Sequence, residues 1–224
     1  MKKRALGYYD YTVVLTYCGM LSAFSGIIFA INLRFWEAVF CLLISGICDM
    51  FDGAVAATKD RTPSEKKFGI QIDSLSDLIS FGVLPGLFVY MVCSSSISGE
   101  GNSKAFMIFA SVASALFALC ALIRLAYFNV LEEERQSQTT EKRKSYLGVP
   151  VTTVAVVLPL IYMVYDCKLI KNSLCFPILL IILATGFLSP IEIKKPGFIG
   201  KIVLVIIGIF EAIGMVLFMG WDLL

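Results

Sequence analysis

The chain has 224 residues, of which 58% are hydrophobic and only 16% are charged. A soluble domain carries roughly 45–50% apolar and about 25% charged residues, so this composition excludes an ordinary aqueous fold and indicates a lipid bilayer as the solvent. The net charge of +2 argues against nucleic acid as a partner. Because histidine is absent from the sequence, catalysis or metal ligation by histidine is excluded. The seven cysteines include no CxxC pair, so we expect reduced thiols rather than disulfides or a zinc site.

Apolar stretches long enough to cross a bilayer follow one another along the chain, since a spanning helix needs about 20 mostly apolar residues. They cover residues 11–32, 35–57, 72–93, 104–128, 148–166, 173–191 and 198–219. The first is longer than the apolar core of a signal peptide and lacks a small-residue cleavage site, so we expect it to remain as a span. The sequence therefore predicts an all-α, polytopic membrane helical bundle. It would form a single domain over residues 1–224, with six helices followed by a seventh span.

The basic residues predict the orientation, because cytoplasmic loops are enriched in Lys and Arg. If the N-terminus is cytoplasmic, 15 of the 19 Lys and Arg residues lie on the cytoplasmic side. The remaining four are Arg34, Lys104, Lys168 and Lys171. We therefore expect a multi-pass protein with its N-terminus inside and its C-terminus outside. A compact chain without targeting signals suggests a bacterial cytoplasmic membrane.

Four aspartates lie where the second span ends and the third begins. Asp49 and Asp52 occur in CDMFDGAVA, and Asp73 and Asp77 occur in FGIQIDSLSDL. Carboxylates within apolar helices cost roughly 2.5–3.5 kcal/mol each and are functional candidates by default. Spacings of three and four place each pair on one helical face, and we expect both pairs at the same membrane depth. Carboxylates without histidine or thiolate favour Mg²⁺, Mn²⁺ or Ca²⁺, and magnesium commonly shares its coordination with substrate phosphates.

The segment 49–77 resembles the signature of the CDP-alcohol phosphatidyltransferases, D-x-x-D-G-x-x-A-R followed by G-x-x-x-D-x-x-x-D. The matching positions are Asp49, Asp52, Gly53, Ala56, Gly69, Asp73 and Asp77. Ala57 stands where arginine is usual, and the interval from there to Gly69 is longer than in the commonest pattern. We hypothesise that Lys59 or Arg61 supplies the missing positive charge.

The resemblance implies two divalent ions, Mg²⁺ or Mn²⁺, held by the four aspartates against the pyrophosphate of a CDP-linked lipid. It implies Asp77 as the general base. The CDP site would use small and charged residues of the signature and the adjoining connection: Asp52, Gly53, Ala56, Gly69, Lys66 and Lys67. The small residues could instead serve only helix packing, and the two lysines could instead be only markers of the cytoplasmic side.

Further segments resemble the serine-accepting branch of the family. They are SLSDLISFGVLPG at 74–86, IRLAYFNVLEEE at 123–134 and YLGVPVTT at 146–153. This resemblance implies CDP-diacylglycerol and L-serine as substrates, CMP and a serine phospholipid as products, and a homodimer in the lipid membrane. Arg124 and Asn129 are candidates for binding the serine carboxylate and amine, although an arginine at a span end also commonly snorkels to the interface. Glu211 lies inside the seventh span without an obvious partner. It could line either a dimer contact or a polar groove.

Two alternative functions stay open. The same chemistry could use glycerol phosphate or inositol phosphate as the acceptor, which would need an additional basic pocket. A divalent-cation transporter also uses intramembrane carboxylates. Such a transporter would place them near the bilayer midplane on broken helices related by an internal repeat, and the sequence shows no such repeat.

Overall fold

The computed structural model describes residues 7–97, 104–138, 145–194 and 198–221. The basic residues 2–4, 142–144 and 195, used above to predict the orientation, lie outside these ranges. Within them the α-helices are α1 (Val14–Ile31), α2 (Phe35–Ala56), α3 (Pro63–Asp77), α4 (Leu84–Ile97), α5 (Lys104–Gln138), α6 (Val154–Asp166), α7 (Cys175–Leu188) and α8 (Phe198–Trp221). Short 3-10 turns, η1 (Tyr11–Val13) and η3 (Val151–Thr153), precede α1 and α6. The chain is an all-α helical bundle, as the sequence predicted.

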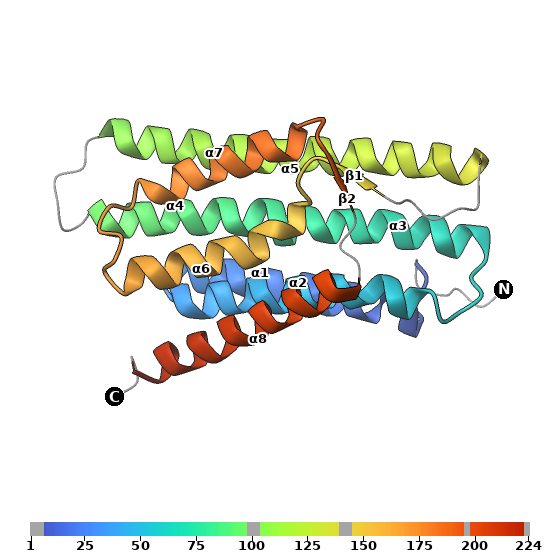
Figure 1. Ribbon diagram of the computed structural model, residues 1–224, viewed down its shortest axis with the longest axis horizontal. Coiled ribbons are helices and arrows are strands. Elements are labelled where there is room, and N and C mark those ends of the chain that lie inside the picture. The colour runs from blue at the N-terminus through green and yellow to red at the C-terminus, as the bar shows by residue number, and fades with distance from the viewer. Residues whose placement is uncertain (1–6, 98–103, 139–144, 195–197, 222–224) are drawn as a thin grey trace.

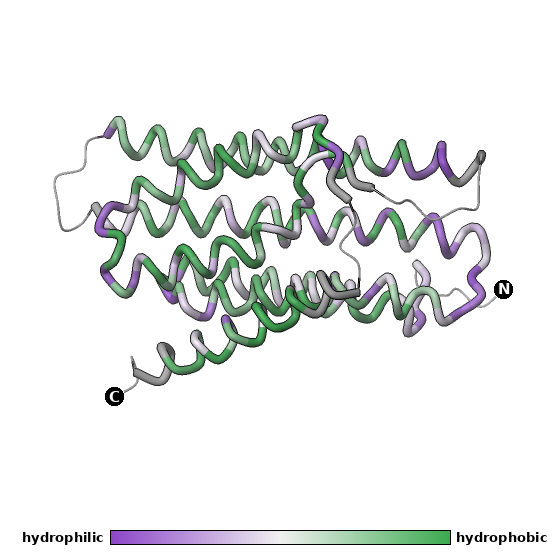
Figure 2. Tube along the Cα trace, in the orientation of Figure 1, coloured by the Kyte–Doolittle hydropathy of each residue, from purple (hydrophilic) through white to green (hydrophobic). Residues whose placement is uncertain are grey.

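The helices run roughly along one axis, and the short turn η1 and the last turns of α8 lie at opposite ends of it (Figure 1). Among the described residues, four segments are long and apolar enough to cross a membrane: Tyr11–Ile31, Phe35–Ala56, Pro63–Ser96 and Lys104–Arg135. Shorter apolar helices occupy Val151–Asp166, Cys175–Leu188 and Val205–Leu217, where the last three spans were expected. Hydrophobic positions dominate the middle of the bundle, and hydrophilic ones gather toward its ends (Figure 2).

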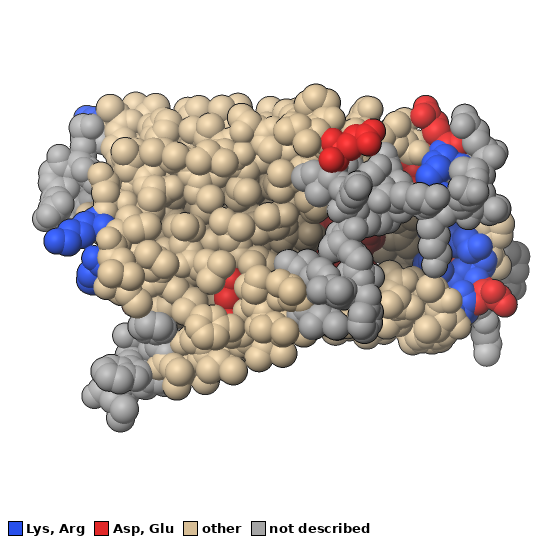
Figure 3. Space-filling view, in the orientation of Figure 1, with Lys and Arg blue, Asp and Glu red and all other residues tan. Residues whose placement is uncertain are grey.

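The outer surface of α5 is apolar. Large hydrophobic side chains are exposed along it at intervals of one to four residues, at Ile108, Val112, Leu116, Leu119, Leu122 and Ile123. On the face drawn in Figure 3, the Lys and Arg side chains lie only at the two ends of the long axis. An aqueous protein would not expose so continuous an apolar stripe, whereas a lipid bilayer stabilises it. The chain is therefore a multi-pass membrane protein.

The third helix begins at Pro63, nine residues before the predicted start of the span. The Thr62 side chain accepts a hydrogen bond from the Glu65 backbone, and the Glu65 side chain accepts one from the Thr62 backbone, forming a capping box with Pro63 in the first turn. Hydrophobicity did not predict these first turns because they are polar. The consequence is that Gly69 and Asp73 lie on the same continuous helix.

A π-helical segment, η2 (Leu78–Val83), joins α3 to α4 directly after Asp77. Pro85 follows it, and a proline within a helix lacks the backbone N–H donor and crowds the preceding turn. A π turn is a common way to absorb such a disturbance, and π turns often occur at functional sites. Here it lies directly after the last of the four aspartates.

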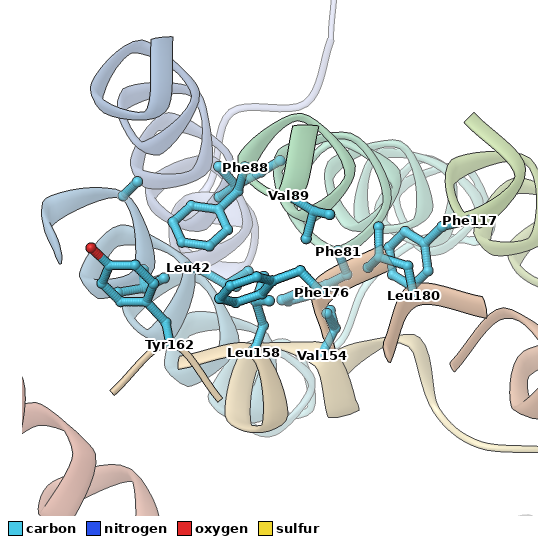
Figure 4. Packing of buried hydrophobic residues seen from close by; sticks show 14 of the residues in the cluster. Leu42, Phe81, Phe88, Val89, Phe117, Val154, Leu158, Tyr162, Phe176 and Leu180 are labelled. Carbon is cyan, nitrogen blue, oxygen red and sulfur yellow. The ribbon is translucent and has the colours of Figure 1, made fainter. Parts of the chain in front are cut away.

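The apolar core lies among α2, α4, α6 and α7 and is rich in aromatic rings (Figure 4). Phe88 is 1% exposed, and its ring packs edge-on against Phe35 and Tyr162, with centroids 5.6 and 5.4 Å apart. Trp36 packs edge-on against the same Tyr162 at 4.9 Å. Such offset and edge-on pairs are favourable beyond the area that they bury.

A short antiparallel ladder adds a detail that the sequence did not predict. Strand β1 (Ser145–Leu147) pairs with β2 (Glu192–Lys194), with Leu147 opposite Glu192. Gly148 follows β1 with φ of +67°, and a Cβ there would lie 2.7 Å from the Ser189 carbonyl oxygen. Only glycine fits this turn. The ladder links the segment before α6 to the segment after α7.

Candidate active site

Four aspartates from α2 and α3 meet in the structure. Asp49 and Asp52 lie in the last two turns of α2, and Asp73 and Asp77 lie in the last two turns of α3. Carboxylate oxygens of Asp49, Asp52 and Asp73 all lie within 4.8 Å of one another. Asp77 lines a small cavity together with Asp49 and Asp52, so it belongs to the same cluster. All four residues are half-buried.

Helix α1 also contributes to the cluster, which the sequence analysis missed. Thr16 Oγ1 donates a hydrogen bond to Asp52 Oδ2 at 3.2 Å, and Ser76 Oγ donates to the Thr16 carbonyl at 3.3 Å. Ser45 Oγ lies 2.8 Å from Ser80 Oγ. The hydroxyl groups and three of the aspartates line a small cavity of about 10 Å³. Serine and threonine within apolar helices could have indicated polar contacts at this site. Which residues they contact, however, depends on how the helices pack.

The donor set fits a divalent cation. Carboxylates this close repel one another unless a proton or a cation lies between them. Within the described part of the chain, Lys and Arg residues form no ion pair with any of the four aspartates. The atoms available to bind a metal ion are therefore carboxylate and hydroxyl oxygens, which suit Mg²⁺, Mn²⁺ or Ca²⁺.

The small residues of the signature leave open surface beside the cluster. A Cβ added at Gly53 would meet no atom within 4 Å, so a ligand can approach the backbone there. Ala56, one turn further on, is half-buried. Lys66 is exposed, whereas Lys67 Nζ lies 3.2 Å from Glu133 Oε1 in an exposed ion pair. The structure thus gives Lys67 a partner and places Lys66 in solvent.

Of the two candidates for the missing positive charge, Lys59 is engaged elsewhere. Its Nζ lies 2.7 Å from Asp10 Oδ2 and 3.3 Å from Glu65 Oε1. Hydrogen bonds from Lys59 and Thr12 lower the pKa of Asp10 to about 2, so this carboxylate stays charged beside the lysine. The structure therefore favours Arg61 over Lys59.

The two candidate serine-binding residues lie on α5 in different surroundings. Arg124 is 5% exposed, and its Nη1 donates to the Leu147 and Phe187 carbonyls at 2.7 and 3.1 Å. These bonds give Arg124 a structural role, and a serine-binding role for it stays a prediction. Asn129 Oδ1 accepts a hydrogen bond from Ser74 Oγ at 2.9 Å, which places Asn129 beside the residue that follows Asp73.

A larger groove lies away from the aspartates, between α4 and α5. It has a volume of about 370 Å³ and is lined by Val83, Gly86, Leu87, Tyr90, Ser111, Ser114, Ala115 and Ala118. Because no charged side chain lines this groove, it offers nothing to neutralise a phosphate. The acidic cluster is therefore the better candidate for a site that handles nucleotide.

Glu211 on α8 is 0% exposed, and neither of its carboxylate oxygens has a hydrogen-bond partner among the described residues. The helix packs closely around it, since a Cβ added at Gly214 would lie 2.6 Å from the Met163 side chain. A side chain buried within one chain is not available to line a dimer contact.

Comparison with known proteins agrees with the geometry. Residues 12–188 match the model of the family described as CDP-alcohol phosphatidyltransferase. A CDP-diacylglycerol–serine O-phosphatidyltransferase of Helicobacter pylori is 31% identical over 195 residues, covering 84% of this chain and 70% of that protein. Proteins of the same name from Methanocaldococcus jannaschii and Saccharomyces cerevisiae are 30% and 33% identical, covering 89% and 70% of this chain. The matches span 82% of the Methanocaldococcus protein and 56% of the yeast protein.

Proposed function

The chain belongs to the CDP-alcohol phosphatidyltransferase family, and from that premise we propose that it transfers the phosphatidyl group of CDP-diacylglycerol to the hydroxyl of L-serine, releasing CMP. The convergence of the four aspartates from α2 and α3 supports the chemistry. The names of the relatives support serine as the acceptor, since the match to the Methanocaldococcus serine phosphatidyltransferase covers 89% of the chain. The whole chain would act as one integral-membrane domain.

Asp49, Asp52, Asp73 and Asp77 would hold two Mg²⁺ or Mn²⁺ ions. When bound, such ions would neutralise the charge of the diphosphate and of the departing CMP. The half-buried position of the cluster fits this role, because electrostatic interactions are stronger where water is partly excluded. Thr16, which donates to Asp52, would hold that carboxylate in place.

Asp77 is proposed as the general base. It takes the proton of the serine hydroxyl as the serine oxygen forms a bond to the lipid-linked phosphorus. The bond from that phosphorus to the bridging oxygen of CMP breaks, and its electron pair leaves with CMP. An aspartate with an ordinary pKa near 4 is a weak base for an alcohol, so charge stabilisation at the phosphate must lower much of the barrier.

The cytidine diphosphate would lie beside the open surface at Gly53, with Asp52, Ala56 and Gly69 around it and Lys66 nearby. A contact from Lys67 would require its exposed pair with Glu133 to open, and such pairs contribute little. The serine would bind on the α5 side, where Asn129 lies beside Ser74. We extend the proposal to a homodimer in the cytoplasmic membrane, with the N-terminus and the site facing the cytoplasm.

The decisive experiment supplies purified protein in lipid nanodiscs with CDP-diacylglycerol, Mg²⁺ or Mn²⁺, and one acceptor at a time. We expect CMP release and phosphatidylserine with L-serine, and neither with glycerol phosphate or inositol phosphate. Product formation with a phosphorylated acceptor alone would refute the serine assignment. Divalent-cation flux into liposomes without CMP release would refute the enzyme and support a transporter.

A further inference from the structure

Arg61 lies in the short connection between α2 and α3, and its guanidinium has no hydrogen bond or ion pair with a described residue. Its Nε is buried without a partner. Its Nη1 lies over Gly69, where an added Cβ would come within 2.9 Å of that nitrogen. A half-buried guanidinium without a partner anion among the described residues is unusual, because removing charge from water is costly unless the charge is paired.

The connection around Arg61 is held on both sides. Before it, Tyr11 Oη and Thr58 Oγ1 are hydrogen-bonded at 3.1 Å, and Lys59 Nζ lies 2.7 Å from Asp10 Oδ2. After it, Thr62 is fixed by the capping box that begins α3. The connection is therefore anchored on both sides of Arg61, whose Nη1 lies over Gly69.

This position is close to the acidic cluster. Gly69 and Asp73 are four residues apart on α3, so they share one face of the helix and are separated by about 6 Å along its axis. The guanidinium nevertheless pairs with no carboxylate of the residues that the structure describes. A cation one helical turn from the aspartates, with its buried Nε unpartnered and no hydrogen bond to a described residue, fits an anion that lies between the two.

We propose that Arg61 binds the diphosphate of the CDP-linked substrate, supplying from the α2–α3 connection the positive charge that Ala57 lacks. The planar fork of a guanidinium matches the oxygens of a phosphate group and binds them in pairs. Gly69 has no side chain, which leaves the space that the guanidinium occupies. The inference rests on the proposed function in one respect, namely that the substrate carries a CDP group.

The test measures CDP binding to the full chain in nanodiscs with Mg²⁺, by isothermal titration calorimetry. We expect Arg61→Ala to weaken CDP binding at least tenfold and to raise the KM for CDP-diacylglycerol with a smaller change in kcat. Arg61→Gln, which keeps most of the side-chain volume, should lose affinity similarly and covers the case in which the alanine variant does not fold. Arg135→Ala is the matched control, because Arg135 pairs with Glu132 and should leave CDP affinity unchanged.

Wild-type CDP affinity in a folded Arg61→Gln variant would overturn the inference, as would a wild-type protein that does not bind CDP. Failure of the proposed function gives a different result. If the Arg61 variants lose CDP affinity while the wild type releases no CMP with serine, the binding role of Arg61 stands and the proposed reaction fails.

Discussion

The two ends of α2 carry opposite kinds of chemistry. Trp36, in the first turn, is 5% exposed and packs against Tyr162 at 4.9 Å. Asp49, thirteen residues and about 20 Å along the same helix, has a carboxylate oxygen within 4.8 Å of oxygens of Asp52 and Asp73. The aromatic end buries apolar surface and stabilises the fold. The acidic end brings together charges that repel one another, so its benefit must come from something that it binds.

The largest expected effect is on catalysis at the acidic end. Asp77→Asn should lower kcat by about 10²–10⁴-fold, because the amide cannot accept the serine proton, while CDP affinity is largely kept. Asp52→Asn should lose both kcat and CDP affinity. Assays of CMP release and CDP binding check both variants. Equal retention of activity in the two variants would contradict the roles given to them.

A variant at the aromatic end should show the reverse behaviour. Phe88→Ala should lower the free energy of unfolding by about 3–5 kcal/mol, because it leaves a cavity among rings that are already close-packed. Its activity per folded molecule should stay near that of the wild type. Phe24→Ala is the control, since Phe24 is 51% exposed. Unfolding in nanodiscs measures both, and an equal loss in the two variants would contradict a packed aromatic core.

A smaller effect is expected between the two ends, at the hydroxyl pair of Ser45 and Ser80. Ser45→Ala removes that 2.8 Å contact and leaves the partner hydroxyl buried, which should cost about 1 kcal/mol of unfolding free energy. Turnover should change less than twofold. A loss of turnover as large as that of Asp77→Asn would mean that these hydroxyl groups belong to the catalytic site.

The smallest effect concerns the Asp10–Lys59 pair. Hydrogen bonds from Lys59 and Thr12 lower the pKa of Asp10 from 3.8 to about 2. Because the pKa is depressed in the folded state, the stabilisation is complete above about pH 4 and is lost as the pH falls through 2. Hydrogen exchange over residues 58–62, corrected for intrinsic rates, should therefore rise from pH 5 to pH 2. Asp10→Asn should remove that dependence, and the same pH dependence in both proteins would contradict the assignment.

The sequence predicted the bundle and the meeting of the aspartates because both depend on local patterns. Long apolar stretches determine where helices form in lipid. The three- and four-residue spacings determine which face each aspartate pair occupies, and the short connection brings α2 and α3 together. The polar first turns of α3 escaped this reasoning, because their signal is the capping box at Thr62 rather than hydrophobicity.

The parts that could not be predicted depend on contacts between distant segments. Thr16 reaches Asp52 across 36 residues, and β1 pairs with β2 across more than 40. Arg124 donates to the backbone carbonyls of Leu147 and Phe187. Every residue has such a carbonyl, so the sequence could not identify these two as acceptors. Ala57 in place of the usual arginine indicated that another residue supplies the positive charge. Arg61 became the better candidate only when the structure showed Lys59 in ion pairs with other residues.

The most direct test of the central claim is to titrate Mn²⁺ into the protein with CDP present and count bound ions by electron paramagnetic resonance while assaying CMP release. The account predicts two bound ions per chain in the wild type, activity that is lost with a chelator and restored by Mn²⁺, and loss of both binding and activity in an Asp49→Asn/Asp73→Asn double variant. Unchanged Mn²⁺ binding in that double variant, or full wild-type activity in the presence of the chelator, would contradict it.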